Sequence, residues 1–215
     1  MKKFILILAL IISPTALLAA EPIAERPHWS LEFKGGDFIP DIANWSQFYG
    51  NRYTGEYGGS LAYKLLRPLE VGIEASYIED RGQGLAPIHN ITAGNVTYKL
   101  YPVNVFVLAR GVFSEKQWLV PYLGGGWTRI FYREEVENQG VVRGAANGYH
   151  ARAGLQLLLD GIDQSAAGNF YRDFGVYHTY LFLEAKYTRA MVDTVSGSSV
   201  NIGGTSWLGG FLFEF

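Results

Sequence analysis

The residue types that most often do chemistry are sparse in this sequence. It contains four histidines, at positions 28, 89, 150 and 178, and no cysteine. These histidines share no spacing typical of metal ligands, and no thiolate is available, so we expect neither a metal nor a cofactor. His150 lies two positions before Arg152, on the same face of a strand. We interpret His150 as a hydrogen-bonding interior residue and not as a catalytic base.

Pairs of carboxylates are the other candidates for acid–base chemistry. Glu70 and Glu74 are four positions apart, which places both side chains on one face of a strand. Such a pair can donate and accept protons, but the polar positions also carry cations such as Lys64 and Arg152. We favour salt-bridge packing for this pair, and we predict no catalytic residue and no enzymatic activity.

Strands are the elements that must position these charges. Apolar and polar residues alternate through much of the sequence, which is the pattern of a strand with two different faces. In residues 69–77, for example, every odd position is apolar. The pattern predicts eight strands, at about 29–39, 55–66, 69–79, 95–112, 118–133, 146–159, 177–191 and 204–215.

The predicted connections alternate between short and long. Short turns fall at 67–68 and 113–117, and a longer connection at 160–175 is expected to contain a helical turn. Pro102 and the glycine run at 124–126 predict a bulge or a register change in the central strands. The long loops are expected at about 40–54, 80–94, 134–145 and 192–203.

The two faces of the predicted strands differ in composition. The apolar positions carry almost no charge, and they end in aromatic residues that suit a lipid–water boundary. The polar positions combine charge with glycine, serine and alanine, as a narrow barrel interior requires. These boundary aromatics are Trp29, Tyr57, Tyr77, Tyr149, Tyr187, Trp207 and Phe215.

These features predict an all-β fold, an eight-stranded antiparallel up-and-down transmembrane β-barrel. A soluble periplasmic sandwich shows the same alternation and stays as the alternative. In the barrel, nine charged side chains share one interior and must pair, because an unpaired buried charge is costly. We therefore predict a salt-bridged, essentially closed lumen. The nine residues are Glu32, Lys34, Glu56, Lys64, Glu70, Glu74, Arg152, Glu184 and Lys186.

The N-terminal residues have the layout of a secretory signal peptide. Two lysines precede a long apolar run, and Ala19-Ala20 offers a cleavage site. A membrane anchor is the alternative, although Pro14 interrupts the run. The net charge of −2, without a basic cluster, argues against nucleic acid as a partner. We expect a signal peptide at 1–20, a short periplasmic segment at 21–28 and the outer-membrane barrel at 29–215.

The first long loop, at 40–54, is rich in aromatic residues. Two interpretations stay open: the rings contact a ligand, lipopolysaccharide or a partner, or they extend a strand and join the aromatic belt. The residues concerned are Trp45, Phe48, Tyr49 and Tyr53.

Three motifs carry a resemblance to known proteins: the alternating strands over 29–215, PYLGGGW at 121–127, and the terminal WLGGFLFEF. On these motifs the chain resembles the small outer-membrane β-barrel superfamily, of the OmpA transmembrane-domain, OmpX and OmpW kind. The resemblance implies a monomer in the outer membrane of a Gram-negative bacterium, in contact with outer-membrane lipid and lipopolysaccharide. It also implies that the last strand is read by the barrel-assembly machinery. The residues that fit that assembly signal are Trp207, Phe211, Phe213 and Phe215.

The resemblance leaves three functions open. The first is a structural or surface-interaction role through long extracellular loops, and it is the one we expect. The second is an OmpW-like binder or transporter of small apolar molecules. The third is a lipid A-modifying enzyme, of which the deacylase type uses a His-x-Ser motif. Neither His150-Ala151-Arg152 nor His178-Thr179-Tyr180 supplies that serine.

Overall fold

The computed structural model describes residues 27–114 and 117–215. The predicted signal peptide and most of the segment at 21–28 lie outside the described residues. Among the residues that are described, no helix has the length and apolar character needed to cross a membrane.

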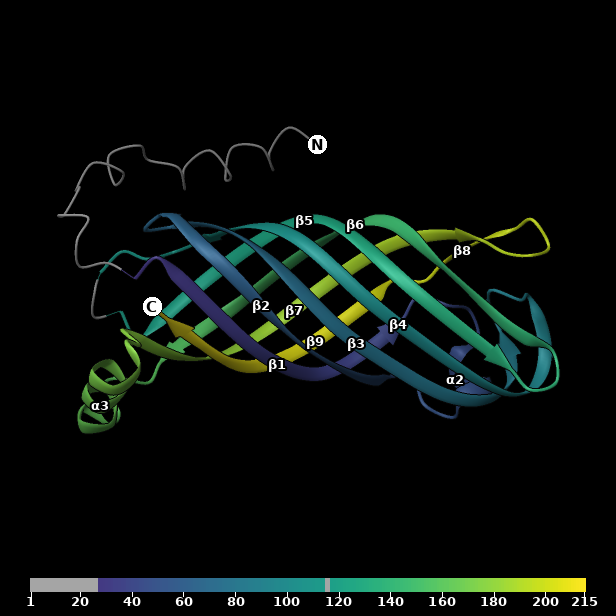
Figure 1. The fold of residues 1–215 in the computed structure, drawn as a ribbon, viewed down its shortest axis with the longest axis horizontal. Coiled ribbons are helices and arrows are strands. Elements are labelled where there is room, and N and C mark those ends of the chain that lie inside the picture. Colours follow the sequence, from purple (N-terminus) through teal and green to yellow (C-terminus); the bar gives the residue numbers. More distant parts are fainter. Residues whose placement is uncertain (1–26, 115–116) are drawn as a thin grey trace, which may run out of the picture.

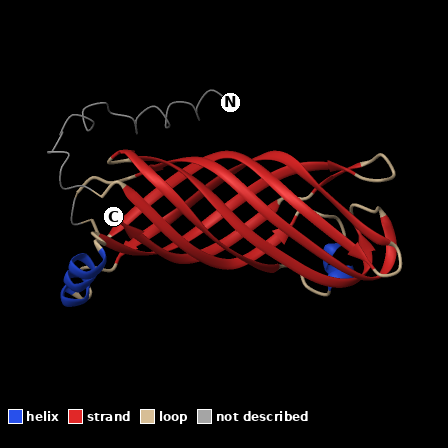
Figure 2. Cartoon of the chain, viewed as in Figure 1, coloured by secondary structure: helices blue, strands red, loops and turns tan. Residues whose placement is uncertain are grey.

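Eight long antiparallel strands form a closed barrel (Figures 1 and 2). Each strand from β1 to β7 pairs with the next, and β9 closes the barrel by pairing with both β7 and β1. The short strand β8 (Ser199–Asn201) pairs with the end of β7 alone. This arrangement confirms the predicted fold class. The barrel strands are β1 (Trp29–Pro40), β2 (Thr54–Leu66), β3 (Leu69–Ala86), β4 (Ile91–Arg110), β5 (Leu119–Val136), β6 (Gly140–Leu158), β7 (His178–Asp193) and β9 (Gly204–Glu214).

Two of the predicted long loops are wrong, because strands occupy most of their residues. Strand β3 continues to Ala86 and β4 begins at Ile91, so little of the expected loop at 80–94 is unpaired. Strands β5 and β6 leave three residues, 137–139, in place of the loop at 134–145. Asn90 and Asn138 adopt positive φ angles of 55° and 60°, which asparagine tolerates in tight turns.

The register of the central strands is continuous, so the predicted bulge or register change there is also wrong. Pairing between β4 and β5 runs without a shift past Pro102 and the glycines at 124–126. Proline removes one hydrogen-bond donor and glycine removes a side chain, and neither adds a residue to the strand. The register shifts lie at 64–66 between β2 and β3, and at 83–84 between β3 and β4.

The barrel has two different ends. The described N-terminus, the C-terminus and α3 (Gln164–Phe174) lie at one end, which we call the terminal end (Figure 1). Helix α2 (Trp45–Tyr49) and the long hairpins lie at the other, which we call the hairpin end. Helix α3 confirms the helical turn expected at 160–175. The Asp163 carboxylate accepts a hydrogen bond from the Ala166 amide at 2.9 Å and so caps the first turn of α3.

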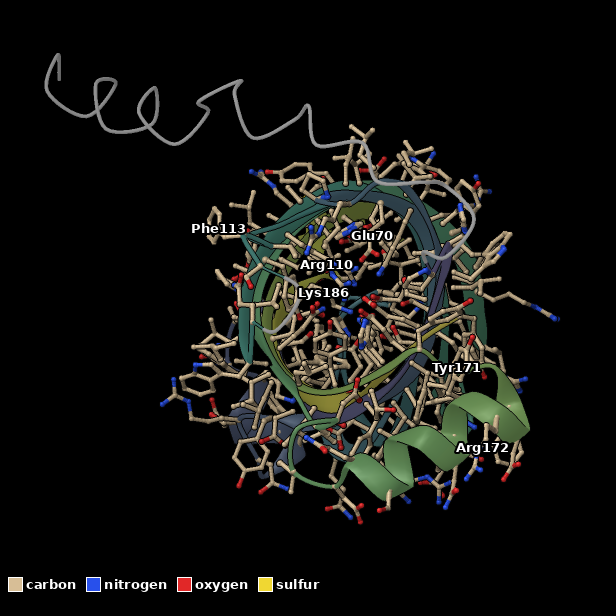
Figure 3. The ribbon with its side chains drawn as sticks, turned by 90° about the vertical axis from the view of Figure 1, so that its left-hand side faces the viewer. Glu70, Arg110, Phe113, Tyr171, Arg172 and Lys186 are labelled. Carbon is tan, nitrogen blue, oxygen red and sulfur yellow. The ribbon has the colours of Figure 1, made fainter. Side chains whose placement is uncertain are left out.

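The outward surface changes character along the strands. Tyr77, Tyr101, Trp127 and Tyr149 point outward and mark the boundary between a terminal half and a hairpin half. In the terminal half, outward residues are apolar, as at Leu183, and charged residues point inward. Figure 3 looks along the barrel axis from the terminal end and shows side chains from the whole wall filling the interior. This is the arrangement that a barrel in lipid requires.

Candidate functional site

The largest group of buried charges lies around Glu74. Its carboxylate accepts from Lys186 at 2.8 Å, from Arg152 at 3.0 Å and from Lys34. We call this group the central network, and none of its residues is more than 6 % exposed. Its members are Glu32, Lys34, Glu56, Glu74, Arg152, Glu184 and Lys186.

Every charge in the central network has at least one oppositely charged neighbour. The Lys186 ammonium also contacts Glu56 at 2.6 Å, and Lys34 also contacts Glu184 at 3.1 Å. The Arg152 guanidinium lies 3.4 Å from Glu184 and 3.6 Å from Glu32. Because these pairs share partners, the network cross-links five of the eight barrel strands, namely β1, β2, β3, β6 and β7. Breaking any one pair would leave a buried charge with fewer contacts.

Neutral residues complete the hydrogen bonding of these carboxylates. Ser60 donates to Glu32 at 2.6 Å and Tyr122 donates to Glu184 at 3.0 Å. Asn104 donates to Glu74 at 2.9 Å. Thr128 donates to Asn104 at 2.7 Å and also lies 2.9 Å from His150 Nδ1. His150 therefore belongs to a chain of hydrogen bonds that leads to Glu74.

A second group of buried charges lies nearer the terminal end. Glu214 contacts Lys64 at 2.5 Å and also contacts Arg110. The Arg110 Nε atom lies 3.7 Å from Glu70, which also accepts from Ser30 at 3.1 Å. The Arg110 guanidinium sits 5.6 Å from the centre of the Tyr180 ring. We call Lys64, Glu70, Arg110 and Glu214 the terminal network.

The structure places all nine predicted lumen charges inside the barrel, but in two networks and not in one. The Lys64 side chain is the most accessible of them, at 12 % exposed. Sequence reasoning missed Arg110 as a member of the networks. Its even number places it on the same face of β4 as Asn104 and Leu108, both buried. Extending the alternation of β4 to its last residue would have found Arg110.

Apolar side chains fill the hairpin half, and α2 is part of this packing. Trp45 and Tyr49 of α2 are 4 % and 6 % exposed and stack on each other with ring centres 3.8 Å apart. Trp45 meets the Tyr98 ring edge-on at 5.5 Å, and the Tyr49 hydroxyl donates to the Leu85 carbonyl at 3.0 Å. Burial raises the pKa of the Tyr49 phenol. We call this packing the hairpin cluster; it also includes Phe38, Ile78, Ile88, Leu100 and Ile130.

The interpretation of Trp45 and Tyr49 as members of the aromatic belt is therefore wrong, whereas their contact with a ligand stays a prediction. Their rings neither contact solvent nor extend a strand into the aromatic belt, because the barrel interior offers them apolar partners. Phe48 packs partly against the hairpin cluster, and Tyr53 is 55 % exposed. A glycine makes room for the helix: a Cβ atom on Gly82 would lie 2.6 Å from the Tyr49 ring.

A buried carboxylate holds the β3–β4 turn over the hairpin end. Glu134 is fully buried, and it accepts from the amides of Ile88 at 3.0 Å and His89 at 2.7 Å. Its Oε1 atom also lies 2.6 Å from His89 Nδ1. The Val195 amide donates to the Ile88 carbonyl at 3.2 Å, which ties the β7–β8 turn to the same place. The alternation pattern gave no sign of this role for Glu134, because the segment was expected to be a loop.

A small interior cavity lies between the central network and the hairpin cluster. Its volume is about 10 Å³, which is at the lower limit for a single water molecule. Glu56, Lys186 and Ser206 line one part of it, and Phe38 and Ile130 line another. The space suits a water that bonds to the charged side.

One further histidine pairs with a carboxylate at the terminal end. His178 Nδ1 lies 2.7 Å from Asp160 at the terminal end, and Asp160 also accepts from the Thr179 amide at 3.0 Å. Within the described part of the chain, no cluster of three or more His, Asp or Glu side chains could hold a metal ion.

The predicted assembly residues all lie on the closing strand or directly after it. Trp207 and Phe211 are exposed on the outward face of β9, and Phe213 is half-buried. Phe215 exchanges backbone hydrogen bonds with Trp29, at 2.8 and 3.0 Å. The last residue of the chain is thus held to the first residue of β1.

Comparison with known proteins shows the fold. No protein-family model matches the sequence, and no curated protein matches it significantly. Among solved structures, OprG from Pseudomonas aeruginosa aligns with a TM-score of 0.57, at 11 % identity, over 88 % of this chain and 97 % of that one. The N-terminal barrel domain of Pseudomonas aeruginosa OprF aligns with a TM-score of 0.53, at 11 % identity, over 88 % and 98 %. Neisserial surface protein A aligns with a TM-score of 0.53, at 12 % identity, over 87 % and 97 %.

These likenesses agree with the geometry of the wall and the interior. The closed antiparallel sheet, the apolar outward surface of the terminal half and the buried ion pairs occur together in this chain. The chain has the fold of the small eight-stranded outer-membrane β-barrels, with buried salt bridges in its interior.

Proposed function

We propose that this protein is a closed outer-membrane barrel that acts structurally or as a surface-interaction module through its hairpin end, without catalysis. The observation that carries the proposal is the filled interior. The central network crosses the lumen at mid-height, and the hairpin cluster with α2 fills the barrel above it. A hydrated pore would need a continuous path past both.

The hairpin end supports the choice of partner. The outward residues Lys99, Arg133 and Arg143 are direct cross-strand neighbours in β4, β5 and β6. Like charges placed opposite each other destabilise a sheet, and an anion beside them removes that cost. Lys99 lies 3.6 Å from Glu79 and Arg133 lies 3.1 Å from Glu135. In the described chain Arg143 forms no ion pair with an acidic side chain. Phosphates of lipopolysaccharide in the outer leaflet are the partner that we propose.

A second candidate function is the binding or transport of small apolar molecules. The hairpin cluster favours it, because withdrawal of α2 would open an apolar chamber at the mouth. Helix α2 has only five residues, and no side chain caps its N-terminus. The central network would still lie below that chamber.

Conductance and solute uptake separate the two functions. The mature protein in planar bilayers is expected to show no steady conductance, and liposomes containing it should not take up an apolar fluorescent probe faster than protein-free liposomes. Trp45→Ala removes the contact of α2 with Tyr98 while leaving the residues of the central network unchanged. Unchanged conductance with faster probe uptake in this variant would favour the apolar-molecule function, whereas steady conductance of the unmodified protein would exclude the closed barrel.

Location, orientation and assembly have their own tests. Cell fractionation should place the protein in the outer membrane, and protease added to whole cells should cut at the hairpin end and not at α3. Removal of Phe215 should lower the amount of heat-modifiable, assembled monomer, because the proposed assembly signal ends there. Cutting at α3 from outside the cell would reverse the proposed orientation.

A further inference from the structure

Helix α3 has two different faces and lies outside the barrel wall (Figure 3). None of its side chains is buried. At 3.6 residues per turn, Phe170, Tyr171 and Phe174 fall on one side of the helix. Ser165 and Asn169 fall on the other side. The sequence predicts a helical turn here and indicates no role for it.

The apolar face of α3 continues the apolar outward surface of the barrel. The Phe170 ring stacks on the Phe213 ring of β9, with centres 6.5 Å apart and planes inclined by 14°. Phe213 in turn meets the Phe33 ring of β1 at 6.5 Å. The surface that faces lipid on β1 and β9 therefore extends without interruption onto the helix.

Water is a poor solvent for this face. Phe174 is 69 % exposed, and Ile162, just before the helix, is also exposed. Removing large apolar side chains from water is favourable. Another exposed aromatic side chain lies on the opposite side of the same end, where Phe113 projects from the β4–β5 connection (Figure 3).

We propose that α3 is an interfacial helix that lies flat on the membrane leaflet at the terminal end, with Phe170 and Phe174 inserted among the acyl chains. The proposal rests on the proposed placement of the barrel in a bilayer and adds a second, peripheral lipid contact to it. Ser165 and Asn169 then face the aqueous side.

The charges around α3 indicate what drives this contact. Arg172 is the one cation of the helix, and its side chain donates to the Gly168 carbonyl at 3.3 Å and to Asn169. Asp173 is the next residue and Asp163 precedes the first residue of the helix, so the segment carries more negative than positive charge. Burial of the aromatic rings therefore supplies the binding, and anionic headgroups are not required. The helix should insert equally into zwitterionic and anionic membranes.

Spin labels at single cysteines test the proposal directly, because the natural chain has no cysteine to remove. Phe174→Cys places the label on the apolar face. Ser165→Cys, nine residues and about two and a half turns away, places it on the opposite face with almost no change in side-chain size. Leu183→Cys places it on the barrel wall, where the side chain is 70 % exposed. Each labelled full-length mature protein is refolded into phosphatidylcholine vesicles, with and without phosphatidylglycerol.

The readout is the collision rate of each label with oxygen, which concentrates in lipid, and with a water-soluble nickel complex. Labels at 174 and 183 should both favour oxygen, and the label at 165 should favour nickel, giving a several-fold difference between the two helix positions in both lipid mixtures. If 183 favours oxygen while 174 and 165 both favour nickel, the helix proposal fails and the membrane barrel stands. If 183 also favours nickel, the membrane placement itself fails. Dependence on phosphatidylglycerol would contradict insertion driven by the aromatic rings.

Discussion

The two halves of the barrel have opposite polarity. In the terminal half, Leu183 and its outward neighbours are apolar while Glu74 and Arg152 are buried inside. In the hairpin half, the outward positions of the same strands carry charges such as Arg81, Arg133 and Arg143, and the interior is apolar apart from Glu134 and a few hydroxyl groups. The hairpin half thus has the polarity of an ordinary soluble β-barrel, with an apolar interior and charges outside. The terminal half has the inverse polarity.

The solvent outside the wall explains the difference. Against lipid, an outward charge is costly, so the charges lie inside and must pair with each other. Beyond Tyr77 and Tyr101 the outward charges indicate water, and the usual hydrophobic core becomes favourable. Each strand keeps its alternation along its whole length, while the apolar residues change from its outward face to its inward face.

Removing the central carboxylate should have the largest effect. Glu74→Gln leaves Lys34, Arg152 and Lys186 around a neutral side chain, and loss of one partner of a buried ion pair costs about 3–5 kcal/mol. Urea unfolding in vesicles, followed by heat-modifiable gel migration, measures the change. Glu135→Gln is the matched control, because its pair with Arg133 is exposed and such pairs contribute about 0–1 kcal/mol. Equal effects of the two variants would contradict the importance of the central network.

Placing a charge on the outward surface should distinguish the two halves directly. Leu183→Arg puts a cation against lipid in the terminal half, at a cost of about 2–4 kcal/mol near the membrane midplane. Val141→Arg makes the same change on the outward face of β6 in the hairpin half, where the cost should be about 0–1 kcal/mol. The same unfolding measurement compares them. Similar costs would show that both halves meet the same solvent.

Filling the space beside α2 should weaken the hairpin half alone. A Cβ atom on Gly82 would lie 2.6 Å from the Tyr49 ring and 2.8 Å from the Phe48 carbonyl, so Gly82→Val must displace α2. Overpacking of this kind costs about 1–3 kcal/mol. Limited proteolysis should then cut the segment 41–53 faster, while conductance stays as low as in the unmodified protein. Gly161→Ala is a suitable control, because a Cβ atom there would meet open space. Gly50→Ala is not, because Gly50 has a positive φ of 79°.

The smallest effect is expected at the row of outward cations. Arg143→Gln removes one of three neighbouring positive charges and should stabilise the barrel by about 0.2–1 kcal/mol in vesicles without lipopolysaccharide. Addition of lipopolysaccharide should reverse the order of stability, because the variant offers the phosphates one cation fewer. An unchanged order after this addition would argue against the proposed lipid partner.

The change of polarity also explains where sequence reasoning succeeded and where it failed. Alternation with apolar residues outward predicted the strands of the terminal half almost to the residue. The alternation pattern predicted that β3 ends at about residue 79 and that β6 begins only near 146. Both positions are close to the places where charged residues move to the outward face. Charged outward residues such as Arg81 and Arg143 therefore looked like loop residues.

The candidate site was predictable to a similar extent. The odd or even position of each residue along its strand assigned nine charged side chains to the interior, because successive side chains point to opposite faces of a strand. The division into two networks depends on the height of each residue in the closed barrel, which follows from strand register. The burial of Trp45 and Tyr49 depends on a loop folding back into the mouth, and no local pattern records that contact.

The sequence by itself determined the alternation, the number of barrel strands and nine of the inward charges, because these follow from local geometry with a period of two. Only the tertiary structure decided which charges meet, how α2 closes the hairpin end and how α3 joins the outer surface through Phe170 and Phe213. Those contacts join residues up to 150 positions apart, as Lys34 and Glu184 are. They exist only once the register of eight strands has closed the barrel.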